Sequence, residues 1–109
     1  AQGLGWLTTE ELVWNAKGEL LTKGASTYKI PTAADMPTQL NIDLWHEANV
    51  EDNVGGSKAV GEPPFMLGIS VFEALRDAVA QTIGDNTPVQ LNAPATPERV
   101  LMALQTKPR

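Results

Sequence analysis

The segment from Pro64 to Ile83 constrains the fold most, because its pattern fits an α-helix with one apolar side. A polar stripe recurs along it at Ser70, Glu73, Asp77 and Gln81. The opposite side is filled by large apolar residues, namely Phe65, Ile69, Phe72, Leu75, Val79 and Ile83. The pair Pro63-Pro64 suits the first turn of a helix, and Gly84 suits its end. We therefore predict one long helix over this segment.

The composition allows one small core. The chain has 109 residues, of which 42% are hydrophobic, so we expect a single domain over residues 1–109. Its net charge of -5 repels phosphate backbones, which argues against nucleic-acid binding. No apolar run of about 18 residues occurs, which excludes a membrane span. Cysteine is absent, which excludes a zinc ribbon and cysteine-ligated iron–sulfur clusters from this chain.

Three further elements are predicted around the long helix. Two β-prone runs, 11–14 and 19–22, flank a four-residue connection that ends in Gly18, a pattern typical of a hairpin. Residues 39–44 alternate polar and apolar, which predicts a strand with its apolar side chains, Leu40, Ile42 and Leu44, facing inward. The run Thr96-Pro97-Glu98 predicts the start of a short last helix. Together these elements predict an α+β fold: a small antiparallel sheet, one long helix and a short C-terminal helix.

The first residues look like the interior of a longer protein. The chain begins without Met and already within an apolar pattern, so we expect a fragment whose first element is truncated. No basic region followed by an apolar stretch marks a signal peptide. We expect a cytoplasmic protein.

Glu62 is the residue that chemistry singles out. It follows a Gly-rich run and directly precedes Pro63-Pro64, so it lies where the long helix begins. The positive end of the helix dipole favours an ionised carboxylate there, and an ionised carboxylate can act as a base. An acid at a helix start more often only stabilises the helix. Both interpretations, a catalytic base and a structural acid, stay open at this level.

The other candidate groups fit structural roles better. His46 is the sole histidine, which is too few for a metal site of the usual kind. The spacing of Gly55, Gly56 and Gly61 matches neither phosphate-binding loop pattern. The acids of residues 47–52 do not follow the EF-hand pattern, so they indicate a solvated loop. We predict no metal ligands among these residues.

Five runs, in order along nearly the whole chain, carry a resemblance. They are Gln2-Gly3-Leu4-Gly5 with Thr8 and Glu10-Glu11-Leu12, Ser26-Thr27-Tyr28-Lys29-Ile30-Pro31, Ser57-Lys58-Ala59-Val60-Gly61-Glu62-Pro63-Pro64, Gly68-Ile69-Ser70-Val71-Phe72 with Ala74 and Asp77-Ala78, and Ala93-Pro94-Ala95-Thr96-Pro97-Glu98. In this order they resemble the xanthine dehydrogenase family of molybdenum hydroxylases, at the carboxyl-terminal end of the molybdenum-binding large subunit.

The resemblance implies a role for the loop before the long helix. Glu62 would be the general base that takes the proton of a molybdenum-bound hydroxyl, during oxidation of hypoxanthine or xanthine to uric acid. Val60 and Gly61 would run their backbone beside the molybdenum–molybdopterin cofactor, where glycine permits close approach.

The resemblance also implies partners. The rest of the large subunit and the domains or subunit that carry FAD and [2Fe–2S] clusters would complete the enzyme, and a purine would be its substrate. The isolated fragment is expected to hold no cofactor and to be inactive. Two alternatives stay open: a related aldehyde or N-heterocycle oxidase segment, and a non-catalytic α+β packing or interaction module.

Overall fold

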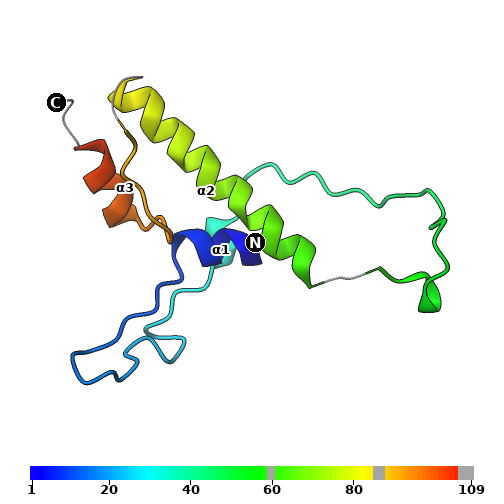
Figure 1. The fold of residues 1–109 in the computed structure, drawn as a ribbon, viewed down its shortest axis with the longest axis horizontal. Helices are drawn as coiled ribbons and strands as arrows, with labels where there is room; N and C mark the ends of the chain where they lie inside the picture. Colours follow the sequence, from blue (N-terminus) through cyan, green and yellow to red (C-terminus); the bar gives the residue numbers. More distant parts are fainter. Residues whose placement is uncertain (59–60, 85–87, 106–109) are drawn as a thin grey trace.

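Three α-helices dominate the part of the chain that the structure describes. The structure is a computed structural model, and it describes residues 1–58, 61–84 and 88–105. The helices are α1 (Gln2–Thr8), α2 (Glu62–Ile83) and α3 (Pro97–Leu104), and two short 3₁₀ turns are η1 (Ala33–Asp35) and η2 (Val54–Gly56). Figure 1 shows α1 crossing the first half of α2, while α3 lies beside its second half.

The chain is more open than a compact domain of its size. Its radius of gyration is 18.2 Å, whereas a close-packed domain of about 100 residues has about 13 Å. Two long segments account for the difference, residues 10–31 and residues 37–58, and both extend away from the helices (Figure 1). The helices and the segment before α3 pack closely together.

The long helix is confirmed, and it begins two residues before the predicted start. Glu62 is its first residue, with Gly61 as the preceding cap and a proline in the first turn. It ends at Gly84, whose φ of 92° lies in the left-handed region that favours glycine, and whose N–H bonds the Ala80 carbonyl at 3.0 Å. The start and stop residues therefore act as the sequence predicts.

The core lies between the second half of α2, residues 88–95 and α3. Its buried members are Val79, Leu91, Ala95 and Ala103. The predicted last helix is confirmed, because the Thr96 hydroxyl accepts the Arg99 N–H at 3.3 Å as an N-cap. Partly buried apolar residues of α2, of α3 and of the segment between them pack against the buried four, namely Phe72, Leu75, Ile83, Val89 and Val100.

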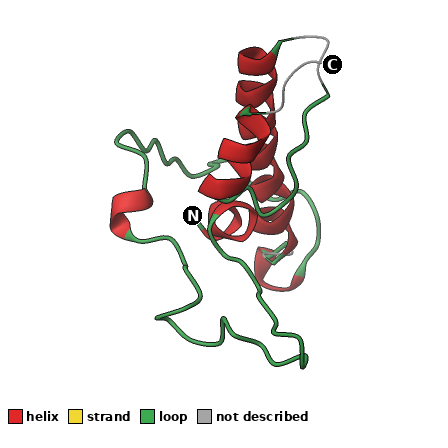
Figure 2. Cartoon of the chain, turned by 90° about the vertical axis from the view of Figure 1, so that its left-hand side faces the viewer, coloured by secondary structure: helices red, strands yellow, loops and turns green. Residues whose placement is uncertain are grey.

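The predicted hairpin exists as a single antiparallel bridge. Trp14 pairs with Leu20, and the Leu21 N–H bonds the Val13 carbonyl at 2.7 Å. Gly18 has a φ of 80°, as the turn requires. Figure 2 shows helices and loops, and within the described residues no pairing longer than this bridge forms. The helical part of the α+β prediction is therefore confirmed, while the small antiparallel sheet is not.

Residues 39–44 form no strand in this structure. The inward orientation predicted for their apolar side chains is wrong here, because Leu40, Ile42 and Leu44 are 56%, 79% and 76% exposed. A strand needs a partner for its backbone N–H and C=O groups. Within the described residues this segment runs clear of the helices, so it has none (Figure 1).

None of the helices among the described residues combines the length and the apolar content that a membrane crossing requires.

Candidate active site

Glu62 occupies the first position of a 22-residue helix and is exposed. The four free N–H groups at such a helix start, together with the helix dipole, favour a negative charge beside them. The structure therefore gives this carboxylate the helix position that the sequence predicts.

The residue before it leaves the backbone open to approach. Apart from its two chain neighbours, no atom of the described residues lies within 4 Å of a Cβ built on Gly61, so none of the described residues covers the main chain at this point. Gly61 has ordinary right-handed angles, with φ -83° and ψ -49°, so its conformation does not itself require glycine. Val60, the other residue predicted to lie beside the cofactor, falls outside the described residues.

The first two turns of α2 are held by α1 through two contacts. Trp6 and Phe65 place their ring centroids 5.5 Å apart with the rings tilted by 60°, a favourable aromatic geometry. One turn further on, a Cβ built on Gly68 would lie 2.8 Å from the Gly3 Cα and 3.0 Å from the Gly3 carbonyl oxygen. The helices thus touch backbone to backbone, and we name this pair of contacts the α1–α2 crossing.

Sequence reasoning missed the crossing, although it left a signal. A glycine inside a helix costs about 1 kcal/mol relative to alanine, so a glycine at the centre of the best helical pattern calls for a packing reason. Gly68 is buried and the contact with Gly3 supplies that reason.

Two ionic or polar contacts fix the base of the hairpin. Arg99 donates to Glu11 at 2.5 Å and to the Pro94 carbonyl at 2.8 Å. Tyr28 donates its hydroxyl to Glu10 at 2.5 Å. This hydrogen bond raises the pKa of Tyr28 above its ordinary value of 10.0, and the nearby Glu10 charge acts in the same direction. The sequence held no local signal for either pair, since the partners lie 88 and 18 residues apart.

Thr32 and Asp35 form a smaller polar cluster that caps the start of η1. The Thr32 N–H and the Thr32 hydroxyl both donate to one Asp35 carboxylate oxygen at 2.8 Å. These two bonds lower the pKa of Asp35 from 3.8, the backbone bond contributing most. The arrangement is a capping box. Capping therefore explains the position of the Asp35 carboxylate, and no bound ligand is needed to explain it.

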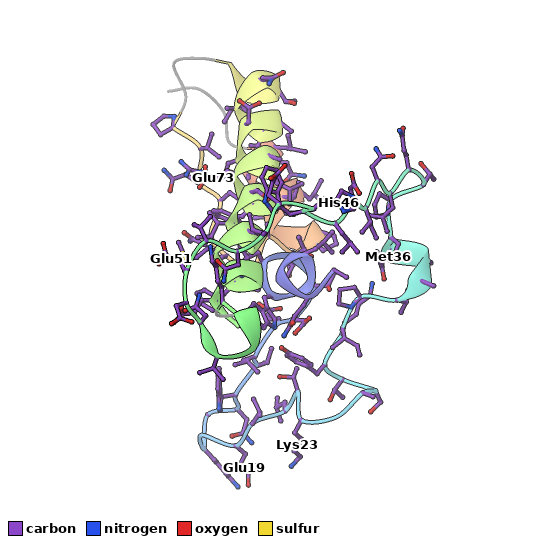
Figure 3. The ribbon with its side chains drawn as sticks, turned by 90° about the vertical axis from the view of Figure 1, so that its right-hand side faces the viewer. Glu19, Lys23, Met36, His46, Glu51 and Glu73 are labelled. Atoms are coloured by element: carbon purple, nitrogen blue, oxygen red, sulfur yellow. The ribbon has the colours of Figure 1, made fainter. Side chains whose placement is uncertain are left out.

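The remaining candidates lie on the long loop before α2. His46 Nε2 is 3.7 Å from Asp43 Oδ1, with both side chains more than four-fifths exposed. Figure 3 shows His46 and Glu51 well separated along that loop. Across residues 1–58, 61–84 and 88–105, no group of three or more acids or histidines lies close enough to hold a metal ion.

Comparison with known proteins connects these features to a family. Residues 1–37, which include α1, match the family described as molybdopterin cofactor-binding domain. The chain is 42% identical over 102 residues to the xanthine dehydrogenase/oxidase of Gallus gallus, a match that covers 91% of this chain. It is 46% identical over 112 residues to xanthine dehydrogenase 1 of Arabidopsis thaliana, covering 94% of this chain. The chain is a segment of the xanthine dehydrogenase type. It spans about 8% of the length of the curated relatives it matches.

A second group of relatives is about equally similar to this xanthine dehydrogenase-type segment. The aldehyde oxidase of Homo sapiens is 43% identical over 109 residues, which covers 97% of this chain and 8% of that protein. Both groups of relatives are therefore named as dehydrogenases or oxidases, which are oxidoreductases. Overall identity does not separate the two groups.

Proposed function

We propose that this chain is the carboxyl-terminal part of the molybdenum-binding domain of a xanthine dehydrogenase, and that Glu62 is its general base. One observation supports this most: the exposed Glu62 carboxylate begins a long helix that is held by α1, which lies in the stretch matched to the molybdopterin cofactor-binding family. The reaction proposed is oxidation of hypoxanthine and xanthine to uric acid. The location proposed is cytoplasmic, as the resemblance implies.

The residues at the start of α2 fit a neighbouring molybdenum–molybdopterin group. The uncovered backbone at Gly61 leaves space for a flat or charged group, and Glu62 beside it is exposed. In this proposal Gly61 and Val60 lie beside the cofactor with their main chain. When bound, the cofactor supplies the two-electron oxidation of the purine carbon.

The contribution of this chain is to hold and move a proton. Glu62 accepts the proton of the oxygen nucleophile that attacks the purine. A positioned base of this kind contributes about 10²–10⁴-fold to rate. FAD and [2Fe–2S] clusters, carried by other domains or subunits, would supply the route by which electrons leave.

The exposed apolar surface supports the remainder of the large subunit as the main partner. Six large apolar side chains of the loop before α2 are 56–98% exposed: Leu40, Ile42, Leu44, Trp45, Val50 and Val54. We name residues 37–58 the arm. An arm so apolar and so extended suits burial against another surface. We propose that residues 39–44 pair there as a strand, which completes the predicted small sheet, and that residues 1–109 act within one domain.

An aldehyde or other N-heterocycle oxidase is the second candidate function, because the human aldehyde oxidase is as similar as the xanthine dehydrogenases. The two share the proposed base and differ in substrate. Turnover of xanthine and of an aromatic aldehyde by the same full-length enzyme separates them. A non-catalytic packing module is the third possibility, and in that case Glu62 only stabilises α2.

The test is turnover of xanthine by the full-length, cofactor-loaded enzyme that carries Glu62→Gln, with molybdenum content measured on the same sample. We expect a loss of about 10²–10⁴-fold with molybdenum retained. Glu73→Gln is the matched control, because Glu73 lies on the same helix, is exposed and pairs only with Arg76 at 3.1 Å. Near-normal turnover of the Glu62 variant would make Glu62 a structural acid and would end the proposal.

A further inference from the structure

The α1–α2 crossing lies between the family-matched stretch and the residue proposed to act as base. On α1, Gly3 and Trp6 are three residues apart, and on α2, Phe65 and Gly68 are three residues apart, so each pair lies on one face of its helix. Two contacts between two helices fix both their separation and their rotation about each other. Since Glu62 lies one turn before Phe65, the crossing governs where its backbone is held.

From this arrangement we infer that Gly68 is a positioning residue, which sets the place of Glu62 by letting α2 rest directly on α1. The inference rests on the proposed function of Glu62. Gly68 lies six residues after Glu62 on α2, and Gly3 lies on α1. Gly68 acts through the helix and touches no reacting atom.

The size of the effect follows from the contact geometry. A methyl group at Gly68 would lie 2.8 Å and 3.0 Å from Gly3 backbone atoms, while carbon atoms in contact prefer about 3.5–4.0 Å. Backbone atoms cannot swing aside as a flexible side chain can, so the helices must separate by about 1 Å. Six residues of helix rise about 9 Å, and an unbroken helix carries this displacement to Glu62 as a rigid body.

A displacement of this size matters for a base. A misplacement of about 1 Å can lower a rate about 10²-fold, even when the mutation lies far from the chemistry. Binding of the purine depends on other groups, so the loss should fall on kcat and leave KM nearly unchanged.

The test compares three variants of the full-length, cofactor-loaded enzyme: Gly68→Ala, Gly24→Ala and Glu62→Gln. Gly24→Ala is the matched control, because Gly24 is exposed and a Cβ there would meet no atom within 4 Å. The readouts are kcat and KM for xanthine, molybdenum content, and hydrogen exchange of the first turns of α2.

We expect Gly68→Ala to lower kcat about 10- to 100-fold, with KM within about threefold, molybdenum retained and faster exchange confined to α1 and the start of α2. Gly24→Ala should match the unmodified enzyme. Normal kcat in Gly68→Ala, beside an inactive Glu62→Gln, would overturn the positioning role and leave the base intact. Near-normal turnover in Glu62→Gln would instead overturn the proposed function itself.

A second variant decides the matter if Gly68→Ala fails to fold or to keep molybdenum. Phe65→Leu removes the aromatic contact with Trp6 and inserts nothing into the crossing. We expect kcat to fall about threefold to tenfold, in line with the strength of aromatic pairs, with KM unchanged and exchange again faster at the start of α2. An unchanged kcat in Phe65→Leu would overturn the inference.

Discussion

The second half of α2 and the arm before α2 differ sharply in what covers their apolar residues. Val79 of α2 is 2% exposed, and Leu91, which packs beside it, is 7% exposed. In the arm, Trp45 and Val54 are 86% and 98% exposed. The helical region therefore finds its apolar partners within the chain, whereas the arm does not. The start of α2 lies between the two extremes, since Phe65 touches Trp6 and is still 60% exposed.

The difference separates the anchored end of α2 from the end that carries the proposed base. The core at one end of α2 anchors the helix, and Glu62 stands at the other end, where the chain is open. A functional site at the less covered end of a rigid element agrees with the general placement of such sites.

The largest change in stability should come from the packed region. Leu91→Ala removes a buried side chain from the core, so we expect the free energy of local opening to fall by about 2–5 kcal/mol. Hydrogen exchange of the second half of α2 in the full-length protein measures it. Gln90→Ala is the control, since Gln90 is exposed and should change the value by less than about 0.5 kcal/mol. Equal effects of the two substitutions would remove the contrast between core and arm.

A charge in the arm should give the next largest effect. In the 109-residue chain, exposed apolar side chains favour self-association, and we expect Ile42→Lys to weaken it about tenfold or more, because burying an isoleucine contributes about 1.5–3 kcal/mol. Sedimentation at several concentrations measures this.

Asn41→Lys adds the same charge at the neighbouring polar position and should weaken association much less. If the two lysine variants weaken self-association equally, the apolar residues of 39–44 do not form the surface through which the chain associates. The strand proposed for residues 39–44 then loses its support.

The smallest effect concerns the hydrogen bond between Tyr28 and Glu10, one of the contacts that tie down residues 10–31. Tyr28 is the sole tyrosine, so its ionisation can be followed by ultraviolet absorbance. The hydrogen bond to Glu10 raises its pKa in the folded chain, so the titration midpoint should lie above 10.0 and should fall toward that value in Glu10→Gln. Because the folded pKa is the higher one, the stabilisation is fully present below the unfolded pKa near 10 and is lost as pH rises through the folded pKa. A midpoint that does not move in Glu10→Gln would show that the contact is absent in solution.

Local rules made the helices predictable. The N-cap Thr96, the proline pair in the first turn of α2 and Gly84 act on residues within one turn of themselves, and in the structure they lie at the ends of α3 and α2. The hairpin turn at Gly18 is equally local.

The crossing and the sheet depend on distant partners, which a pattern cannot name. Gly3 and Gly68 meet across more than sixty residues of sequence, and the Arg99 pair with Glu11 spans 88. The alternation of residues 39–44 holds no information on what its apolar residues pack against. For Glu62, the sequence predicted the helix start, and its role as a base stays a proposal.

The most direct measurement of the central proposal is the rate at which xanthine reduces the full-length, cofactor-loaded enzyme in a rapid-mixing experiment without an electron acceptor. This rate reports the step in which Glu62 would accept a proton. It does not include the later steps in which electrons leave the enzyme. The proposal predicts a rate about 10²–10⁴-fold lower in Glu62→Gln, with molybdenum content unchanged and Glu73→Gln equal to the unmodified enzyme. Reduction at the unmodified rate in Glu62→Gln would contradict the assignment of Glu62 as the base.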